Sequence, residues 1–149
     1  MESTLLEGTT TFLEAIAKRI DKDNGAKAIM KRAISGDQRH LLHTYGLLPS
    51  LSGVRETQQK LWIFVASLYA YYPTQATHQN FGFSCRKLND ATTSGGTERR
   101  FRALLDLSLE DIKTPITALI RQMKSKSILV SYPLLLSDLC QWEHFDQYI

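Results

Sequence analysis

Residues 82–126 read GFSCRKLNDATTSGGTERRFRALLDLSLEDIKTPITALIRQMKSK, and they contain the clearest fold signal of the chain. After Thr114-Pro115 the apolar residues recur every three or four positions, at Ile116, Leu119, Ile120 and Met123. This spacing places them on one face of a helix, and proline is well tolerated at the first helical position. We therefore predict a helix here, with Thr114 as its N-cap.

The same periodicity extends in both directions from this helix. Downstream, a helix is predicted to open near Ser131-Tyr132-Pro133 and to bury leucines 135, 136 and 139. Immediately upstream, we predict a short helix over 84–89, a flexible loop over 91–97, and a helix over 98–106 that buries Phe101, Leu104 and Leu105. The residues Ile128-Leu129-Val130 form the only β-like run, and three residues make a connection rather than a sheet.

The first half of the chain also has helical patterning. The Thr11 and Glu14 pair resembles a capping box before an apolar face at 12, 16 and 20. Further helices are predicted over 26–34, from Gly36-Asp37 to Gly46, and over 55–72 before Pro73. The fold class is therefore all-α, a compact multi-helix bundle. Residues 1–149 form one helical subunit, and the alternative is two small lobes with a boundary near 73–83.

Charge is distributed unevenly along the 149 residues, although the formal net charge is only +3. Residues 18–60 carry nine Lys or Arg against four acids, and residues 82–126 carry nine against five. The terminal segments 1–17 and 127–149 carry three acids each and no Lys or Arg. Basic charge concentrated in this way favours a polyanionic partner more than the net charge indicates.

Three basic stripes at helical spacing are the candidate binding residues. The first combines Lys27 and Lys31 with Arg32, the second contains Arg99, Arg100 and Arg102, and the third contains Thr117, Arg121 and Lys124. Lysine and arginine in such stripes can displace the counterions condensed on nucleic acid. The ordinary alternative is that any soluble helix turns its cations toward water.

The remaining reactive residues carry little functional signal. His40 and His43 are three positions apart but have no third metal ligand near them in sequence. Cys85 lies beside Arg86 and Lys87, which could lower its thiol pKa, yet no base motif surrounds it. Tyrosines 69, 71 and 72 could stack on unpaired bases, although core packing suits an apolar helix better. The sequence predicts no enzyme, no cofactor and no metal.

Two features bear on location. The first residues, MESTLLEGTTTF, are acidic and lack the basic start and apolar core of a signal peptide. The longest apolar run, Leu61–Tyr72, is too short to span a bilayer. With two cysteines and no CxxC motif, the expectation is a cytoplasmic protein that does not bind membranes.

The order of these motifs resembles the CasB family, the small subunit of the type I-E CRISPR complex Cascade. The matching segments are GFSCRKL at 82–88, ERRF at 98–101, ITALIRQMKSK at 116–126 and YPLLLSDLCQW at 132–142. Upstream, NGAKAIMKRA at 24–33 resembles the early basic helix of the family. The family continues past the final tryptophan into a basic aromatic tail, whereas residues 143–149 are acidic, so no contact of that tail is carried over.

The resemblance implies a non-catalytic subunit that holds the target strand and the displaced strand and so stabilises the R-loop. It implies other Cascade subunits, the guide RNA, both DNA strands and a second copy of the chain as partners. It also implies phosphate contacts by Lys31, Arg32, Arg99, Arg100 and Arg121. In the family a Gly-x-Ser turn, here within GFSCRKL at 82–88, leads to a basic residue, and Lys87 matches that residue. Lys27 and Lys124 are added from the helical stripes alone. The alternative function is a helical adaptor whose basic faces dock on acidic proteins.

Overall fold

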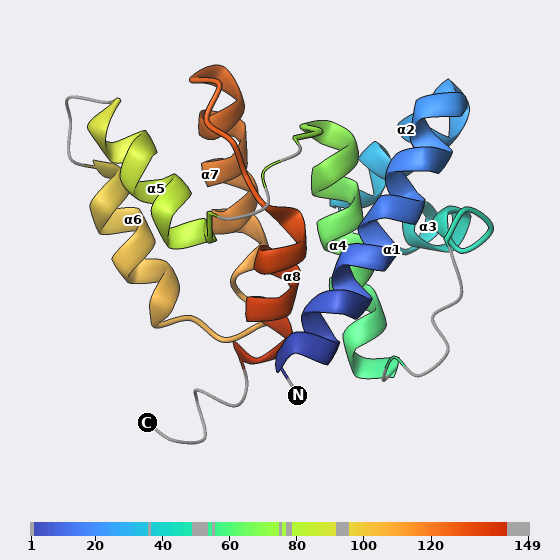
Figure 1. Cartoon of the computed structure of the whole chain (residues 1–149), viewed down its shortest axis with the longest axis horizontal. Coiled ribbons are helices and arrows are strands. Elements are labelled where there is room, and N and C mark those ends of the chain that lie inside the picture. Colours follow the sequence, from blue (N-terminus) through green and yellow to red (C-terminus); the bar gives the residue numbers. More distant parts are fainter. Residues whose placement is uncertain are drawn as a thin grey trace. The chain divides into compact units, whose positions relative to one another are not determined.

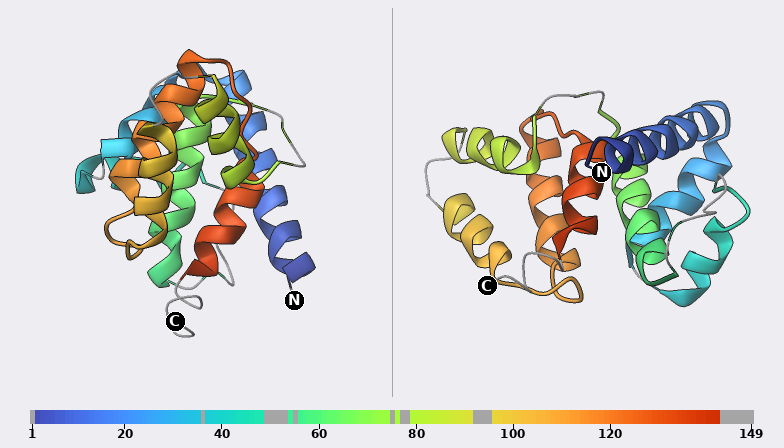
Figure 2. Two further views of the ribbon diagram at one scale, coloured as in Figure 1. Left: turned by 90° about the vertical axis from the view of Figure 1, so that its left-hand side faces the viewer. Right: turned by 60° about the horizontal axis from the view of Figure 1, so that its bottom comes forward.

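The computed structural model describes residues 2–142 except 36, 49–53, 55, 75, 77–78 and 92–95 (Figure 1). Every regular element among these residues is a helix, which confirms the predicted all-α class. The chain divides into two compact units, Met1–Pro73 and Thr74–Ile149. Figure 2 shows the helices of each unit from two further directions. The acidic tail 143–149 lies outside the described residues.

The first unit opens with α1, Glu2–Lys22, which starts well before the predicted capping box at Thr11. Threonine is accepted inside this helix because the Thr9 hydroxyl, fully buried, donates a 3.1 Å hydrogen bond to the Leu6 carbonyl. The predicted apolar face is confirmed, since Phe12, Ile16 and Ile20 are all buried. The capping-box prediction was wrong because the helical pattern continues through Leu5 and Leu6.

Three short elements follow α1. Helix α2 spans Asn24–Arg32, and the Asp23 carboxylate caps it by accepting the Ala26 amide at 3.1 Å. A 3₁₀ turn, Ala33–Ser35, leads to α3, Gln38–Thr44. Asp37 caps α3 by accepting the Arg39 amide at 2.9 Å. Helices α2 and α3 therefore both have an aspartate as their N-cap, one of the residues that N-cap positions prefer.

Helix α4, Glu56–Tyr71, forms the centre of the first unit. It packs on α1 and α2, and every side chain from Leu61 to Ala70 is buried. The Trp62 ring meets Phe12 of α1 edge to face, with centroids 5.0 Å apart and planes at 72°. A helix that is apolar around its whole circumference must be covered on all sides, and this one is.

The second unit contains α5, Phe81–Asp90, α6, Gly96–Leu105, and α7, Lys113–Ser125, which pack on one another. The α7 core face is as predicted, but the helix begins one residue before Thr114, and Ile112 is its N-cap. In α6, Leu104 is buried, whereas Leu105 is 52% exposed, so the prediction that it is buried was wrong. Leu105 is the last residue of α6, where the chain turns away from the core.

The last helix, α8, spans Tyr132–Cys140, which confirms the predicted start near Ser131-Tyr132-Pro133. The Ser131 hydroxyl caps it by accepting the Leu134 amide. The connection before it is held by α5, because the Ser84 hydroxyl donates to the Leu129 carbonyl at 2.7 Å. After α8, the Trp142 indole donates to the Leu107 carbonyl at 2.8 Å, which ties the end of α8 to the turn that follows α6. No helix among the described residues is long and apolar enough to cross a membrane.

Candidate nucleic-acid interface

In the first unit the structure places three of the candidate cations on α2. Lys31 and Arg32 are exposed at the C-terminal end of the helix, and Lys27 is half-buried one turn earlier. Ala26 and Met30 form the buried face of the same helix. The core thus fixes which side of α2 faces inward, and Lys31 and Arg32 are left on the outward side.

In the second unit, α6 presents the densest group of cations. Arg99, Arg100 and Arg102 are all exposed, while Thr97 and Leu104 point into the core. Arg102 pairs with Glu98 one turn earlier, at 2.7 Å between Nη2 and Oε1. Arg99 and Arg100 have no ion-pair partner among the residues that the structure describes. Two uncompensated charges therefore lie side by side on α6.

Helix α7 corrects the third stripe. Arg121 and Lys124 are exposed as predicted, but Thr117 is buried and its hydroxyl donates to the Lys113 carbonyl at 2.8 Å. The exposed row through Arg121 contains Thr114, Ala118 and Ser125 instead. Thr117 was misplaced because a threonine that satisfies its own hydroxyl on the helix backbone can occupy a core position.

Helix α5 carries the last candidate cation, Lys87, which is exposed together with Arg86. Cys85 faces the other way, and burial raises the pKa of its thiol to about 12. The possibility of a lowered thiol pKa is therefore overturned, because the thiol lies in the core and not among the cations beside it in sequence.

The sequence interpretation missed Phe83, a residue of α5 that is 45% exposed. The reason is the predicted start of this helix at residue 84, which left the register of its first turn undefined. In the structure the Asn80 side chain caps the helix by accepting the Phe83 amide at 2.8 Å. Asparagine is a favoured N-cap residue, so Asn80 was the sequence signal that could have located the true start of α5.

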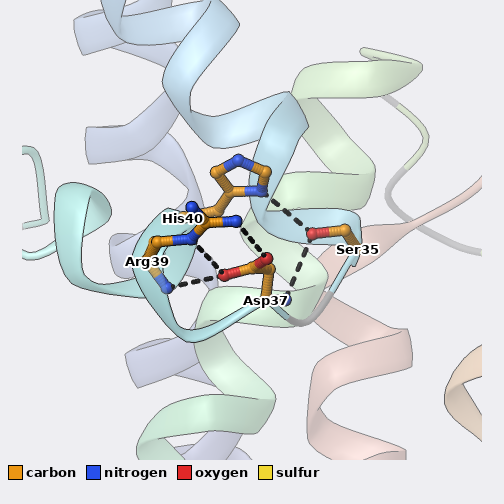
Figure 3. A network of polar contacts seen from close by, with 4 residues as sticks. All are labelled: Ser35, Asp37, Arg39 and His40. Carbon is orange, nitrogen blue, oxygen red and sulfur yellow. Dashed lines mark hydrogen bonds and ion pairs between the residues drawn. The ribbon is translucent and has the colours of Figure 1, made fainter.

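A local polar network lies at the start of α3. The Asp37 carboxylate lies 3.3 Å from Nη2 of Arg39, and the Ser35 hydroxyl lies 3.0 Å from Nδ1 of His40. Figure 3 shows how these four side chains face one another. The Arg39 side chain lowers the pKa of Asp37. The described residues contain no group of three His, Cys, Asp or Glu side chains that could hold a metal ion.

The second unit also contains a pocket of about 450 Å³ between α5, α6, α7 and α8. Its described lining is mostly apolar and includes Phe81, Phe101 and Leu135. Asp138 is the one titratable group among these lining residues, and partial burial raises the pKa of its carboxyl. A single carboxyl with no basic or nucleophilic neighbour in the described lining does not make a catalytic pair.

Two helical units with cations on their outward faces define a helical protein suited to binding an anionic partner. Residues 26–148 match the family of the CRISPR-associated protein Cse2. The chain therefore belongs to the Cse2 family, and the resemblance to the Cascade small subunit CasB is confirmed.

The fold comparison agrees with this family. A solved structure titled "CRISPR RNA-guided surveillance complex" contains a chain similar to this one, with a TM-score of 0.78 and 18% sequence identity. The match covers 97% of this chain and 86% of that one. A search of curated proteins gives no match.

Proposed function

We propose that this chain is a non-catalytic, cytoplasmic small subunit that binds DNA strands within an RNA-guided surveillance complex. It binds the target strand and the displaced strand through phosphate contacts and without reading their base sequence. The proposed contact residues are Lys27, Lys31, Arg32, Lys87, Arg99, Arg100, Arg121 and Lys124. Its partners are the other subunits of the complex, the guide RNA and a second copy of the chain.

The observation that carries the proposal is that most of the candidate cations are exposed and unpaired among the described residues. Lys31, Arg32, Arg99, Arg100 and Arg121 are exposed and have no ion-pair partner among the described residues. A cation that is already paired gains little from a phosphate, because it must first give up its carboxylate. An unpaired cation releases condensed counterions from the strand, and this release is the main source of sequence-independent affinity.

Phosphate contacts of this kind are sufficient for the proposed role. Exchange of a DNA duplex for an RNA–DNA heteroduplex is close to balanced in free energy, so modest contacts to the strand backbone shift it. Binding that ignores base identity also suits a subunit that must accept any target sequence. The chain needs no catalytic group for this function.

The test is fluorescence anisotropy of labelled single-stranded and duplex DNA, titrated with the purified chain at several salt concentrations. We expect log affinity to fall linearly with log salt, with a slope that corresponds to about three to six released counterions. Absence of binding at low salt would contradict the proposal for the isolated chain. Salt-sensitive binding to other subunits of the complex, without DNA binding, would favour the adaptor alternative.

A further inference from the structure

Helix α5 carries an aromatic ring on the side where a soluble helix normally carries polar residues. Its core face consists of Phe81, Ser84, Cys85 and Leu88, all buried. Phe83 lies on the opposite side, with Arg86 and Lys87 exposed on the same half of the helix. The apolar periodicity of α5 is complete without Phe83, so packing within the unit does not explain this residue.

The exposed ring is paired with a cation. The Lys87 ammonium lies 5.3 Å from the centre of the Phe83 ring, one helical turn further along α5. Lys87 has no ion-pair partner among the described residues, so no salt bridge competes with its contact to the ring. The interaction holds the two side chains together and still leaves 45% of Phe83 exposed.

An exposed aromatic ring and an ammonium group at this separation match the two parts of a nucleotide. The ring offers a surface on which a base can stack, and the ammonium offers a charge for the adjoining phosphate. In a duplex both faces of each base are covered by its neighbours, so only an unpaired base can use the ring. Every base has a π-face, so such stacking tolerates any sequence.

We propose that Phe83 and Lys87 form a stacking platform for an unpaired nucleobase of a single strand. This inference rests on the proposed function and adds one property to it, a preference for unpaired bases over phosphates alone. Arg86, exposed beside Lys87, places a second cation next to the platform and favours an anionic strand over an apolar protein segment as its occupant.

The experiment compares two labelled strands with equal numbers of phosphates, a short thymidine strand and its fully abasic counterpart, both titrated with the full chain. The wild-type protein should bind the thymidine strand about five- to tenfold more tightly than the abasic strand. In Phe83→Leu the ratio should fall to about one, with the affinity for the abasic strand unchanged. Phe83→Trp should keep the ratio or raise it, because tryptophan provides a larger stacking surface.

Two controls keep the fold and the surface comparable. Leucine retains the apolar contacts of the half of Phe83 that is buried, and circular dichroism should show unchanged helicity in Phe83→Leu. Leu105→Ala removes an apolar side chain of similar exposure, 52%, from α6 in the same unit, and it should leave the ratio unchanged.

The outcomes separate this inference from the proposed function. If the wild-type chain binds neither strand, the proposed function fails for the isolated chain, and the platform fails with it. If it binds both strands equally, or if Phe83→Leu keeps the wild-type ratio, the platform is wrong while phosphate binding stands. An unchanged ratio together with loss of assembly with the other subunits would assign the ring to a protein contact instead.

Discussion

Arg102 donates a 2.7 Å hydrogen bond from Nη2 to Oε1 of Glu98, while Arg99 and Arg100 on the same helix remain without such a partner among the described residues. The pair is exposed, with 76% of the Arg102 side chain and 54% of the Glu98 side chain open to solvent. Helix α6 therefore presents two kinds of arginine, one compensated and two uncompensated. This difference makes the contribution of each to strand binding separable.

The first prediction concerns the uncompensated arginines. The double variant Arg99→Ala, Arg100→Ala should weaken binding of single-stranded DNA and reduce the slope of log affinity against log salt by about 1.4, since each lost phosphate contact removes about 0.7 on a single strand. Both residues are exposed, and alanine is the strongest helix former, so helicity should be unchanged. Anisotropy titrations over a range of salt concentrations measure the slope.

Arg102→Ala is the matched control on the same helix. It removes one formal charge, but that charge is already opposed by Glu98, so affinity and slope should change less than for either Arg99→Ala or Arg100→Ala. An equal loss for all three arginines would show that α6 contributes only through its total charge and that the pairing is irrelevant.

The second prediction concerns the negative charge of Glu98, which is paired with Arg102. Glu98→Gln keeps the size of the side chain and removes the negative charge that opposes Arg102. Exposed ion pairs of this type contribute at most about 1 kcal/mol, so stability should change little. Strand affinity at low salt should rise about two- to fivefold, which is the change that a fraction of this energy produces. A decrease in affinity would mean that Glu98 itself positions Arg102 for binding.

Much of the second unit could be predicted from its apolar spacing. Ile116, Leu119 and Met123 are buried on α7 as the pattern indicates, because a two-turn apolar stripe has few other ways to leave water. Helix starts were predicted less well. Helix α1 passes through Thr11, where the capping-box motif predicted its start, because the helical pattern continues upstream through Leu5 and Leu6. Thr9 is tolerated inside this helix because its hydroxyl bonds to the helix backbone. A capping box consists of only two residues, and the same two residues also occur at this spacing inside a helix. The motif alone therefore does not locate a helix start.

The candidate site shows the same limits. Exposure of the cations was predictable, since burial of an unpaired charge is costly, and Lys31, Arg99 and Arg121 are exposed as expected. The ion pair between Arg102 and Glu98 depends on the rotamers of both side chains. Sequence periodicity does not specify these rotamers. Phe83 was missed because the predicted helix began at residue 84, and the outward direction of Phe83 depends on the true first residue of α5.

The third prediction concerns the end of α7. Ser127 has a positive φ of 57°, and it follows the C-cap Lys126. The Ile128 amide donates to the Met123 carbonyl at 2.9 Å and the Ser127 amide to the Lys124 carbonyl at 3.3 Å, the bonding pattern of a Schellman motif. Glycine adopts this conformation without strain, so Ser127→Gly should raise the free energy of unfolding by about 0.5–1 kcal/mol.

Ser125→Gly provides a control of opposite sign two positions earlier. Ser125 is the last residue of α7 and has helical backbone angles, where glycine loses more conformational entropy than serine on folding. This variant should therefore lower the free energy of unfolding, and urea denaturation of both variants measures the difference. If both substitutions destabilise the protein, the positive φ of Ser127 contributes no strain.

The fourth prediction concerns Asp138, at the pocket and in the last turn of α8. Burial raises the pKa of this carboxyl above its ordinary value of 3.8, and a negative charge near the C-terminal end of a helix is also unfavourable. A group with a raised pKa in the folded state stabilises the fold most when it is protonated. Its contribution is complete below pH 3.8 and is lost as the pH rises through the folded-state pKa.

Asp138→Asn imitates the protonated form at every pH. At pH 7 the variant should therefore be more stable than the wild-type protein by about 0.3–1 kcal/mol, the usual size of a helix-end charge effect, and the two melting temperatures should converge below pH 3.8. Glu110→Gln removes the same charge from the turn before α7, where the residue neither lines the pocket nor lies at the C-terminal end of a helix, and it should give no such gain. A melting temperature of Asp138→Asn below that of the wild-type protein at pH 7 would mean that the ionised carboxylate makes a stabilising contact that outweighs its burial.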